Sequence, residues 1–163
     1  MGVIAAQPAV LAYRRIDPRG DADVAVRNYR DACVASFGNA RRFIGASRYL
    51  EWLADRVEEY PEGHVLAMLG EQVVGQMELQ VPYGLSSGYV NLFYVAEAFR
   101  GRGWGKVMHG EYAEKYFRSW EASRVELDVS PTNERAVGFY RSLGYRVLRE
   151  AEGGRLWRMG RGV

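Results

Sequence analysis

The sequence has few of the residues that cross-link small proteins or bind metals. Its 163 residues include one cysteine, Cys33, and two histidines, His64 and His109. A single cysteine excludes an intrachain disulfide and a cysteine-based metal site. Neither histidine has a second histidine or a carboxylate at the spacing of metal ligands, so no metal site is expected. We interpret all three side chains as structural, with His109 facing solvent or the flank of its helix.

A long apolar run is also missing, and charge of one sign does not dominate. Residues 2–11 are apolar, but the run is too short to cross a bilayer and no basic segment precedes it. We expect a loose tail there that leads into a first strand. The net charge of +2 is too small to indicate nucleic-acid binding. These absences favour a cytoplasmic protein that binds neither a membrane nor a nucleic acid.

The composition that remains is that of an ordinary globular protein. Hydrophobic residues make up 48% of the chain and charged residues 26%, which is typical of soluble globular domains. The length is sufficient for one domain with its own hydrophobic core. Residues 1–163 are therefore expected to form a single domain, and no internal repeat or linker interrupts them.

Strand-like runs and helical periodicity follow one another along the chain. We predict strands over residues 10–15, 64–69, 73–81, 89–95, 124–129, 145–149 and 156–159. We predict helices over residues 23–37, 49–60, 104–116 and 131–143. Ser47 is a candidate N-cap, Pro131 suits the first turn of a helix, and Gly144 suits the position after one. This order predicts a mixed α/β (α+β) fold and not a helical bundle.

A glycine-rich basic loop between a strand and a helix is the most distinctive stretch. It consists of Arg100, Gly101, Arg102, Gly103, Trp104, Gly105 and Lys106. Loop amides and the start of the helix would converge on an anion, and glycine lets a phosphate approach those amides because it has no Cβ. The dinucleotide fingerprint G-x-G-x-x-G and the P-loop both fail here on spacing. The pattern that fits is R-x-x-G-x-G, carried by Arg100, Gly103 and Gly105.

Two motifs together resemble the GCN5-related N-acetyltransferase (GNAT) superfamily. The first is this R-x-x-G-x-G loop, which looks like the family's acetyl-CoA pyrophosphate loop. The second follows the family's order in Leu127, Val129, Asn133, Ala136, Tyr140, Gly144 and Tyr145. It departs from the pattern only at Tyr145, where phenylalanine is commoner. The resemblance covers roughly residues 63–148.

The resemblance implies a fold and a co-substrate. The GNAT-like acyl-CoA N-acyltransferase fold has a central twisted mixed sheet of about six to seven strands, flanked by about four helices. The strands before and after the central helix splay apart, and acetyl-CoA binds in the opening. The resemblance assigns the pyrophosphate to the glycine loop and the pantetheine arm to Asn133. It also assigns the pantetheine and the thioester carbonyl to the backbone of one strand end, namely Phe93, Tyr94 and Val95.

The same resemblance implies an acyltransferase that moves acetyl directly from acetyl-CoA to a primary amine. A neutral phenol can protonate the leaving thiolate, because a free thiol has a pKa of about 8.5, and Tyr140 stands where the family keeps that tyrosine. Asp128 occupies a position at which some relatives carry a carboxylate base. Glu78 and a chain of water molecules are alternatives for the base. A carboxylate is a poor base for an ammonium unless burial raises its pKa.

A structural interpretation is equally open for the carboxylates. Asp128 and Glu126 could be solvated charges on a strand face, and for Glu78 this is the interpretation that we favour.

Acceptor selection is expected at residues 37–60 and 82–88. Four acidic side chains there fit a solvated helix face; they are Glu51, Asp55, Glu58 and Glu59.

The acceptor itself is left open as a small-molecule or peptide amine. The acyl group could be longer than acetyl, and the aromatic-rich late strands could form a homodimer. One alternative function is a catalytically silent CoA-binding regulatory module of the same fold. The other is a nucleic-acid or nucleotide binder that uses the basic loop, for which the single loop offers no extended basic surface.

Overall fold

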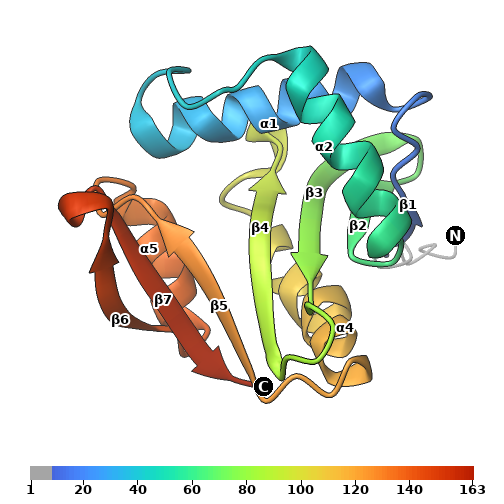
Figure 1. Ribbon diagram of the computed structural model, residues 1–163. Helices are drawn as coiled ribbons and strands as arrows, with labels where there is room; N and C mark the ends of the chain where they lie inside the picture. Colours follow the sequence, from blue (N-terminus) through green and yellow to red (C-terminus); the bar gives the residue numbers. More distant parts are fainter. Residues whose placement is uncertain (1–8) are drawn as a thin grey trace, which may run out of the picture.

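The computed structural model describes residues 9–163, whose sheet has seven strands in the order β1-β2-β3-β4-β5-β7-β6 (Figure 1). The strands are β1 (Ala12–Arg15), β2 (His64–Leu69), β3 (Gln72–Gln80), β4 (Ser87–Val95), β5 (Arg124–Val129), β6 (Arg146–Ala151) and β7 (Leu156–Gly162). β4 and β5 run parallel, and every other neighbouring pair is antiparallel. The predicted mixed sheet is confirmed. The tail expected before the first strand lies mostly outside the described residues.

Helices cover both faces of this sheet. They are α1 (Ala22–Phe37), α2 (Ala46–Glu59), α3 (Trp104–Met108), α4 (Glu114–Ser119) and α5 (Glu134–Ser142). A π-helical turn, η2 (His109–Ala113), joins α3 to α4, so the three form one continuous helix. Short 3₁₀ turns follow β4 (Glu97–Phe99) and β6 (Glu152–Gly154). None of the described helices is long and apolar enough to cross a bilayer.

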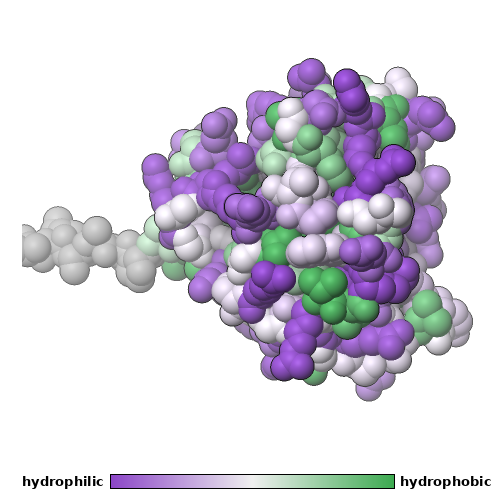
Figure 2. Space-filling model, turned by 90° about the vertical axis from the view of Figure 1, so that its left-hand side faces the viewer, coloured by the Kyte–Doolittle hydropathy of each residue, from purple (hydrophilic) through white to green (hydrophobic). Residues whose placement is uncertain are grey.

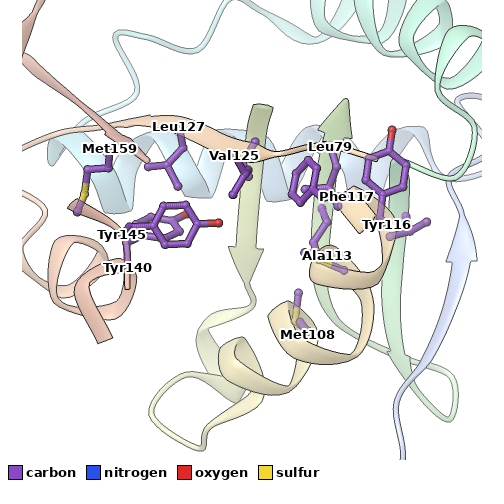
Figure 3. Close-up of a cluster of buried hydrophobic side chains, with 14 of the residues drawn as sticks. Leu79, Met108, Ala113, Tyr116, Phe117, Val125, Leu127, Tyr140, Tyr145 and Met159 are labelled. Carbon is purple, nitrogen blue, oxygen red and sulfur yellow. The ribbon is translucent and has the colours of Figure 1, made fainter. Parts of the chain in front are cut away.

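Side chains alternate along the strands between two hydrophobic clusters. Leu66 of β2 packs with Tyr49 and Leu53 of α2 in the smaller cluster. Its neighbours Val65 and Ala67 belong to the larger cluster, because successive strand residues point to opposite faces. Figure 3 shows that the larger cluster joins the α3–α4 helix to the sheet and extends to Tyr140 and Tyr145.

Gly75 allows the central helix to lie close against the sheet. A Cβ at this position would fall 2.3 Å from the carbonyl oxygen of Tyr94 and 2.6 Å from Cε of Met108. Met108 is fully buried, and burial of such a side chain contributes about 1.5–3 kcal/mol. The close contact places the start of the helix, and the glycine loop before it, directly beside the end of β4.

The parallel strands β4 and β5 separate along their length. Their pairing runs only from Ser87 opposite Arg124 to Val90 opposite Leu127, whereas β4 continues to Val95. In Figure 1 the two strands diverge towards α1. On the other side of β4, Glu78 pairs with Leu92 while Leu79 pairs with Val90, so Asn91 is the extra residue of a β-bulge. The splay therefore begins at the bulge.

Most of the predicted elements are confirmed, and the errors lie at helix ends and within one helix. Gly38 and Gly144 follow their helices in the left-handed conformation, as expected for glycine, which has no Cβ. The last helix begins at Glu134 with Asn133 as its N-cap, so Pro131 lies in the turn before it. The second helix starts at Ala46 after Gly45, which makes the N-cap prediction for Ser47 wrong.

The edge strand β6 is more exposed than its apolar residues suggest. Figure 2 looks at the side of the molecule on which β6 lies and shows hydrophilic residues around small hydrophobic patches. Val147 and Leu148 are exposed apolar side chains of this strand. Leu148 is also the extra residue in a bulge opposite β7, and bulges and charged residues on an edge strand oppose pairing with another edge.

Candidate functional site

A cavity of about 560 Å³ lies where β4 leaves β5. It is lined by eleven of the twelve predicted cofactor-contacting residues, namely Phe93, Tyr94, Val95, Arg100, Gly101, Gly103, Trp104, Gly105, Lys106, Asn133 and Tyr140. Arg102 is the one that does not line it. Ala136 of the second motif also lines the cavity, and residues that the sequence did not single out complete the wall, namely Ala32, Ala35, Ser36, Phe99, Arg135 and Phe139. The volume lies in the range of small-ligand sites.

The glycine loop has the backbone that an anion site requires. Gly101 and Gly103 have φ of +73° and +84°, a left-handed conformation that costs other residues about 1 kcal/mol or more. Gly103 is the N-cap of α3, so the amides of the first helical turn have no partner within the helix. Gly105 meets a different need, because a Cβ there would lie 3.1 Å from the Phe139 ring. The loop presents its amides at the edge of the cavity.

Backbone groups of β4 also face the opening. Ala96 donates its N–H to the carbonyl of Val74 on β3. Backbone groups alternate in direction along an antiparallel strand, so those of Phe93 and Val95 point away from β3. On that side β5 pairs with β4 only as far as Val90. Both N–H groups and the Phe93 carbonyl are therefore left to bind a ligand.

Arg100 binds protein groups behind the loop. Its Nε donates to the Val95 carbonyl at 2.8 Å, and its Nη2 donates to Oδ2 of Asp31 at 2.8 Å. The guanidinium also lies 5.4 Å from the centre of the Tyr94 ring. These contacts join α1, the end of β4 and the loop. Lys106 and Arg135 line the cavity and form no ion pair within residues 9–163, so both charges are available to a ligand.

Tyr140 is buried in the wall of the cavity. Its ring packs on Phe139 and Tyr145 with centroid distances of 5.3 and 5.4 Å. Its hydroxyl forms no side-chain hydrogen bond with residues 9–163. It is also not fully buried: the side-chain polar atoms of these residues that are both fully buried and without a hydrogen-bond partner are Arg56 Nε, His64 Nε2 and the Tyr116 hydroxyl. The Tyr140 hydroxyl is thus open to the cavity. Burial raises the pKa of this phenol, so it remains a proton donor at neutral pH.

Tyr145, the departure from the family pattern, has a partner for its hydroxyl. Nε2 of His109 lies 3.0 Å from that hydroxyl, and both side chains are buried. His109 was expected to face solvent or the flank of its helix, but it is buried: it lies at the start of the π-helical turn and its ring points into the core. Burial, aided by the nearby Arg161 charge, lowers the pKa of His109 to about 4. The imidazole is therefore neutral at physiological pH.

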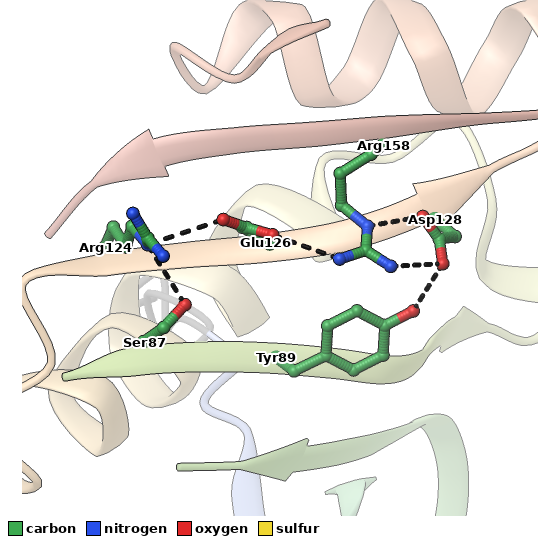
Figure 4. Close-up of polar contacts among 6 residues, drawn as sticks. All are labelled: Ser87, Tyr89, Arg124, Glu126, Asp128 and Arg158. Atoms are coloured by element: carbon green, nitrogen blue, oxygen red, sulfur yellow. Dashed lines mark hydrogen bonds and ion pairs between the residues drawn. The ribbon is translucent and has the colours of Figure 1, made fainter. Parts of the chain in front are cut away.

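Asp128 lies in an ion-pair cluster on the sheet (Figure 4). Arg158 donates from Nε to Oδ1 at 2.6 Å and from Nη2 to Oδ2 at 2.8 Å, and the Tyr89 hydroxyl donates to Oδ2 at 2.9 Å. Burial alone would raise the pKa of Asp128, but the hydrogen bonds from Arg158 and Tyr89 hold it below its ordinary value. Glu126 binds the same guanidinium at 3.1 Å. Asp128 is consequently a poor proton acceptor, and neither carboxylate is simply solvated.

Glu78 is buried, which overturns the favoured interpretation of a solvated charge. Only 2% of its surface is exposed. Its Oε1 accepts hydrogen bonds from the Tyr49 hydroxyl at 2.5 Å and from Nε2 of Gln76 at 2.9 Å. Burial raises the pKa of Glu78 to about 7, although these two hydrogen bonds lower it in part.

Residues 9–163 contain no group of three His, Cys, Asp or Glu side chains that could hold a metal ion.

Two side-chain contacts join the two sides of the opening. Arg42, in the loop between α1 and α2, forms an ion pair with Glu152 in the turn between β6 and β7. Nδ2 of Asn133 lies 3.4 Å from the Ser36 hydroxyl of α1. The acidic residues of α2 are exposed, as expected, and do not line the cavity. Tyr83, in the second expected acceptor region, is fully exposed and away from it.

Comparison with known proteins agrees with this geometry. The family model described as "Acetyltransferase (GNAT) family" matches residues 27–145. No curated protein matches the chain by sequence. Among solved structures, Ard1 from Thermoplasma volcanium superposes with a TM-score of 0.73 at 22% identity, over 94% of this chain and 97% of that one.

Two further solved structures contain ligands. PaiA N-acetyltransferase from Thermoplasma acidophilum, in complex with coenzyme A, has a TM-score of 0.69 at 17% identity over 94% of this chain and 99% of its own. Spermidine N-acetyltransferase from Vibrio cholerae, in complex with CoA and spermine, has a TM-score of 0.73 at 16% identity over 93% and 95% of the two chains. At these identities the likeness establishes the shared fold.

Proposed function

Because the chain belongs to the acetyltransferase (GNAT) family, we propose that it transfers the acetyl group of acetyl-CoA directly to a primary amine. The observation that carries this proposal is the cavity at the splay of β4 and β5. There, free backbone groups, a glycine loop at a helix start and an unpartnered tyrosine hydroxyl face one space. Such a space can hold a thioester, its diphosphate and a leaving thiolate at once.

The parts of acetyl-CoA fit different walls of the cavity. Amides of the glycine loop and the first turn of α3 would hold the pyrophosphate, with Lys106 and Arg135 supplying positive charge. Backbone groups of Phe93 and Val95 would pair with the pantetheine, whose arm passes Asn133. The Asn133 side chain also caps α5, since its Oδ1 accepts the Ala136 N–H at 3.2 Å. Coenzyme A is bound in two proteins of the same fold, which supports acetyl-CoA as the co-substrate.

The chemistry needs an oxyanion donor and an acid for the thiolate. Backbone N–H groups at the end of β4 can stabilise charge on the thioester oxygen, where such donors act strongly. The Tyr140 hydroxyl would protonate the CoA sulfur as the C–S bond breaks. A covalent acetyl-cysteine is not needed: Cys33 is buried, and burial raises the pKa of its thiol, which disfavours the reactive thiolate.

The proposal is tested by measuring binding and transfer separately. Isothermal titration should show binding of acetyl-CoA and CoA but not of NADH. A panel of amines, namely spermine, a peptide with a free N-terminus, a lysine peptide, an aminoglycoside and a free amino acid, is then assayed for thiol release. Release that depends on one of these amines supports an N-acetyltransferase. Tight CoA binding without release for any amine would instead indicate a binding module.

A further inference from the structure

A buried carboxyl network lies beside the opening, on the face of the sheet covered by α1 and α2. Besides its contacts to Glu78, Nε2 of Gln76 donates to the Tyr49 hydroxyl at 2.8 Å, and Asn28 of α1 donates to Oε1 of Gln76 at 3.0 Å. Tyr29 stacks on Tyr49, with their ring centroids 4.4 Å apart. The network therefore ends on one carboxyl group, with helices α1 and α2 above it.

Among residues 9–163, no positively charged side chain pairs with this carboxyl group. The groups that face Glu78 are Asn28 and Tyr29 from α1, Tyr49 from α2, His64 from β2, Gln76 from β3 and Leu92 from β4. Burial lowers the pKa of His64, so its ring is neutral at physiological pH. Burial of a carboxylate without a cation is costly.

Packing alone does not explain why a glutamate occupies this position. The oxygen that accepts from Tyr49 and Gln76 could equally be the amide oxygen of a glutamine, which carries no ionisation cost. The second oxygen, Oε2, has no hydrogen-bond partner among residues 9–163. It is not one of the fully buried polar atoms that lack a partner there. It keeps contact with solvent and is the free acceptor of the network. A group that can lose and regain a proton is what glutamate adds.

The position of Glu78 matches the reacting end of the cavity. Glu78 pairs with Leu92, and the next β4 residue is Phe93, whose free backbone groups face the opening. The bulge at Asn91 lies at the same level, where β4 begins to leave β5. The carboxyl group points to the α1–α2 face, whose Ala32, Ala35 and Ser36 line the cavity. Glu78 is not itself among the residues that line the cavity, so an amine that enters beneath α1 would reach its carboxyl group through a water molecule.

We propose that Glu78, and not Asp128, accepts the proton of the attacking amine through a water molecule. This inference rests on the proposed N-acetyltransferase function. Glu78 takes a proton from the bound ammonium and passes it to solvent. The neutral nitrogen forms the N–C bond, and the C–S bond breaks. Tyr140 protonates the sulfur and is reprotonated, through water, by the second nitrogen proton, so that one proton is released for each amide and thiol formed.

The test compares Glu78→Gln with wild type, using the amine that gives the fastest thiol release. Glutamine keeps the hydrogen-bond acceptor of the network, so the fold and the Kd for acetyl-CoA should be unchanged. The value of kcat should fall about 100-fold or more, as for loss of a general base. Glu71→Gln, at an exposed glutamate in the turn between β2 and β3, is the matched control and should behave as wild type.

A second variant reports on the ionisation itself. The Tyr49 hydroxyl stabilises the carboxylate form of Glu78, so Tyr49→Phe should move the acid limb of kcat/KM to higher pH by about one unit. A purely structural role for Glu78 predicts no such shift. A Glu78→Gln enzyme with kcat within threefold of wild type, or an unmoved acid limb in Tyr49→Phe, would overturn the inference alone. Wild-type protein that acetylates no amine would overturn the proposed function as well.

Discussion

The guanidinium of Arg100 lies 2.8 Å from the carboxylate of Asp31, 69 residues earlier in the chain. The same carboxylate oxygen accepts the Tyr94 hydroxyl at 2.5 Å. Asp31 belongs to α1, whereas Arg100 begins the glycine loop and also binds the last carbonyl of β4. One ion pair therefore fixes the α1 wall of the cavity relative to the loop that would hold the cofactor.

Replacement of Asp31 by asparagine should loosen this link. The side chains are partly exposed, at 21% for Arg100 and 36% for Asp31, so the pair is worth at most about 1 kcal/mol. We expect the Kd for acetyl-CoA to rise up to about fivefold, with little change in the unfolding midpoint. Isothermal titration measures the effect. Arg15→Gln, which breaks an exposed ion pair with Glu62, serves as control. An equal Kd in both variants would show that the Arg100–Asp31 ion pair does not affect cofactor binding at the loop.

Gly103 should be intolerant of a side chain. Its φ of +84° is strained for other residues, so Gly103→Val should turn the loop amides away from the cavity. We expect the Kd for acetyl-CoA to rise about tenfold or more, since each 1.4 kcal/mol changes affinity tenfold. Gly110→Ala is a matched control, because Gly110 has an ordinary φ and open space around its Cα. Unchanged affinity in Gly103→Val would remove the loop from the cofactor site.

Loss of the Tyr140 hydroxyl should slow turnover and leave binding intact. In Tyr140→Phe the ring still packs on Phe139 and Tyr145, but the thiolate loses its acid. The value of kcat should fall about 100-fold, as is typical for a general acid, with an unchanged Kd for acetyl-CoA. Tyr83→Phe, at a fully exposed tyrosine, controls for the substitution. Full turnover of Tyr140→Phe at every pH would show that this hydroxyl has no catalytic role.

Stability should fall with pH through the range set by Glu78. Burial raises the pKa of Glu78 from 4.5 to about 7, so between these values the folded state binds more protons than the unfolded state. The free energy of unfolding then decreases as pH rises, by up to about 3 kcal/mol. Glu78→Gln should remove this slope and be more stable than wild type at pH 8. Urea denaturation at pH 5 and pH 8 measures the difference, and parallel changes in both proteins would refute it.

Local sequence was sufficient for the parts of the site that depend on backbone. The alternating glycines required a loop at a helix start, and Gly101 and Gly103 have the expected positive φ. The resemblance of the second motif assigned Asn133 and Tyr140 to the site, and both line the cavity. The same resemblance assigned Phe93 and Val95, whose role uses backbone groups that do not depend on side-chain identity.

Tertiary contacts decided what the sequence could not. The sequence offered Glu78 and Asp128 as alternative bases, but it could not show that helices bury Glu78 while Arg158 pairs with Asp128. The π-helical turn has no signal in the steps of four from Trp104 to Tyr116, and so His109 was placed at the surface. Ala32 and Ser36 reach the cavity only because α1 crosses the splay.

Transfer of labelled acetyl tests the central claim most directly. The protein is incubated with [¹³C-acetyl]-CoA and each amine of the panel, and free thiol, labelled amide and labelled protein are measured by mass spectrometry. Direct transfer predicts one labelled amide for each thiol released, with no label on Cys33 or any other residue. Thiol release without amide, label retained on the protein, or no reaction with any amine would contradict it.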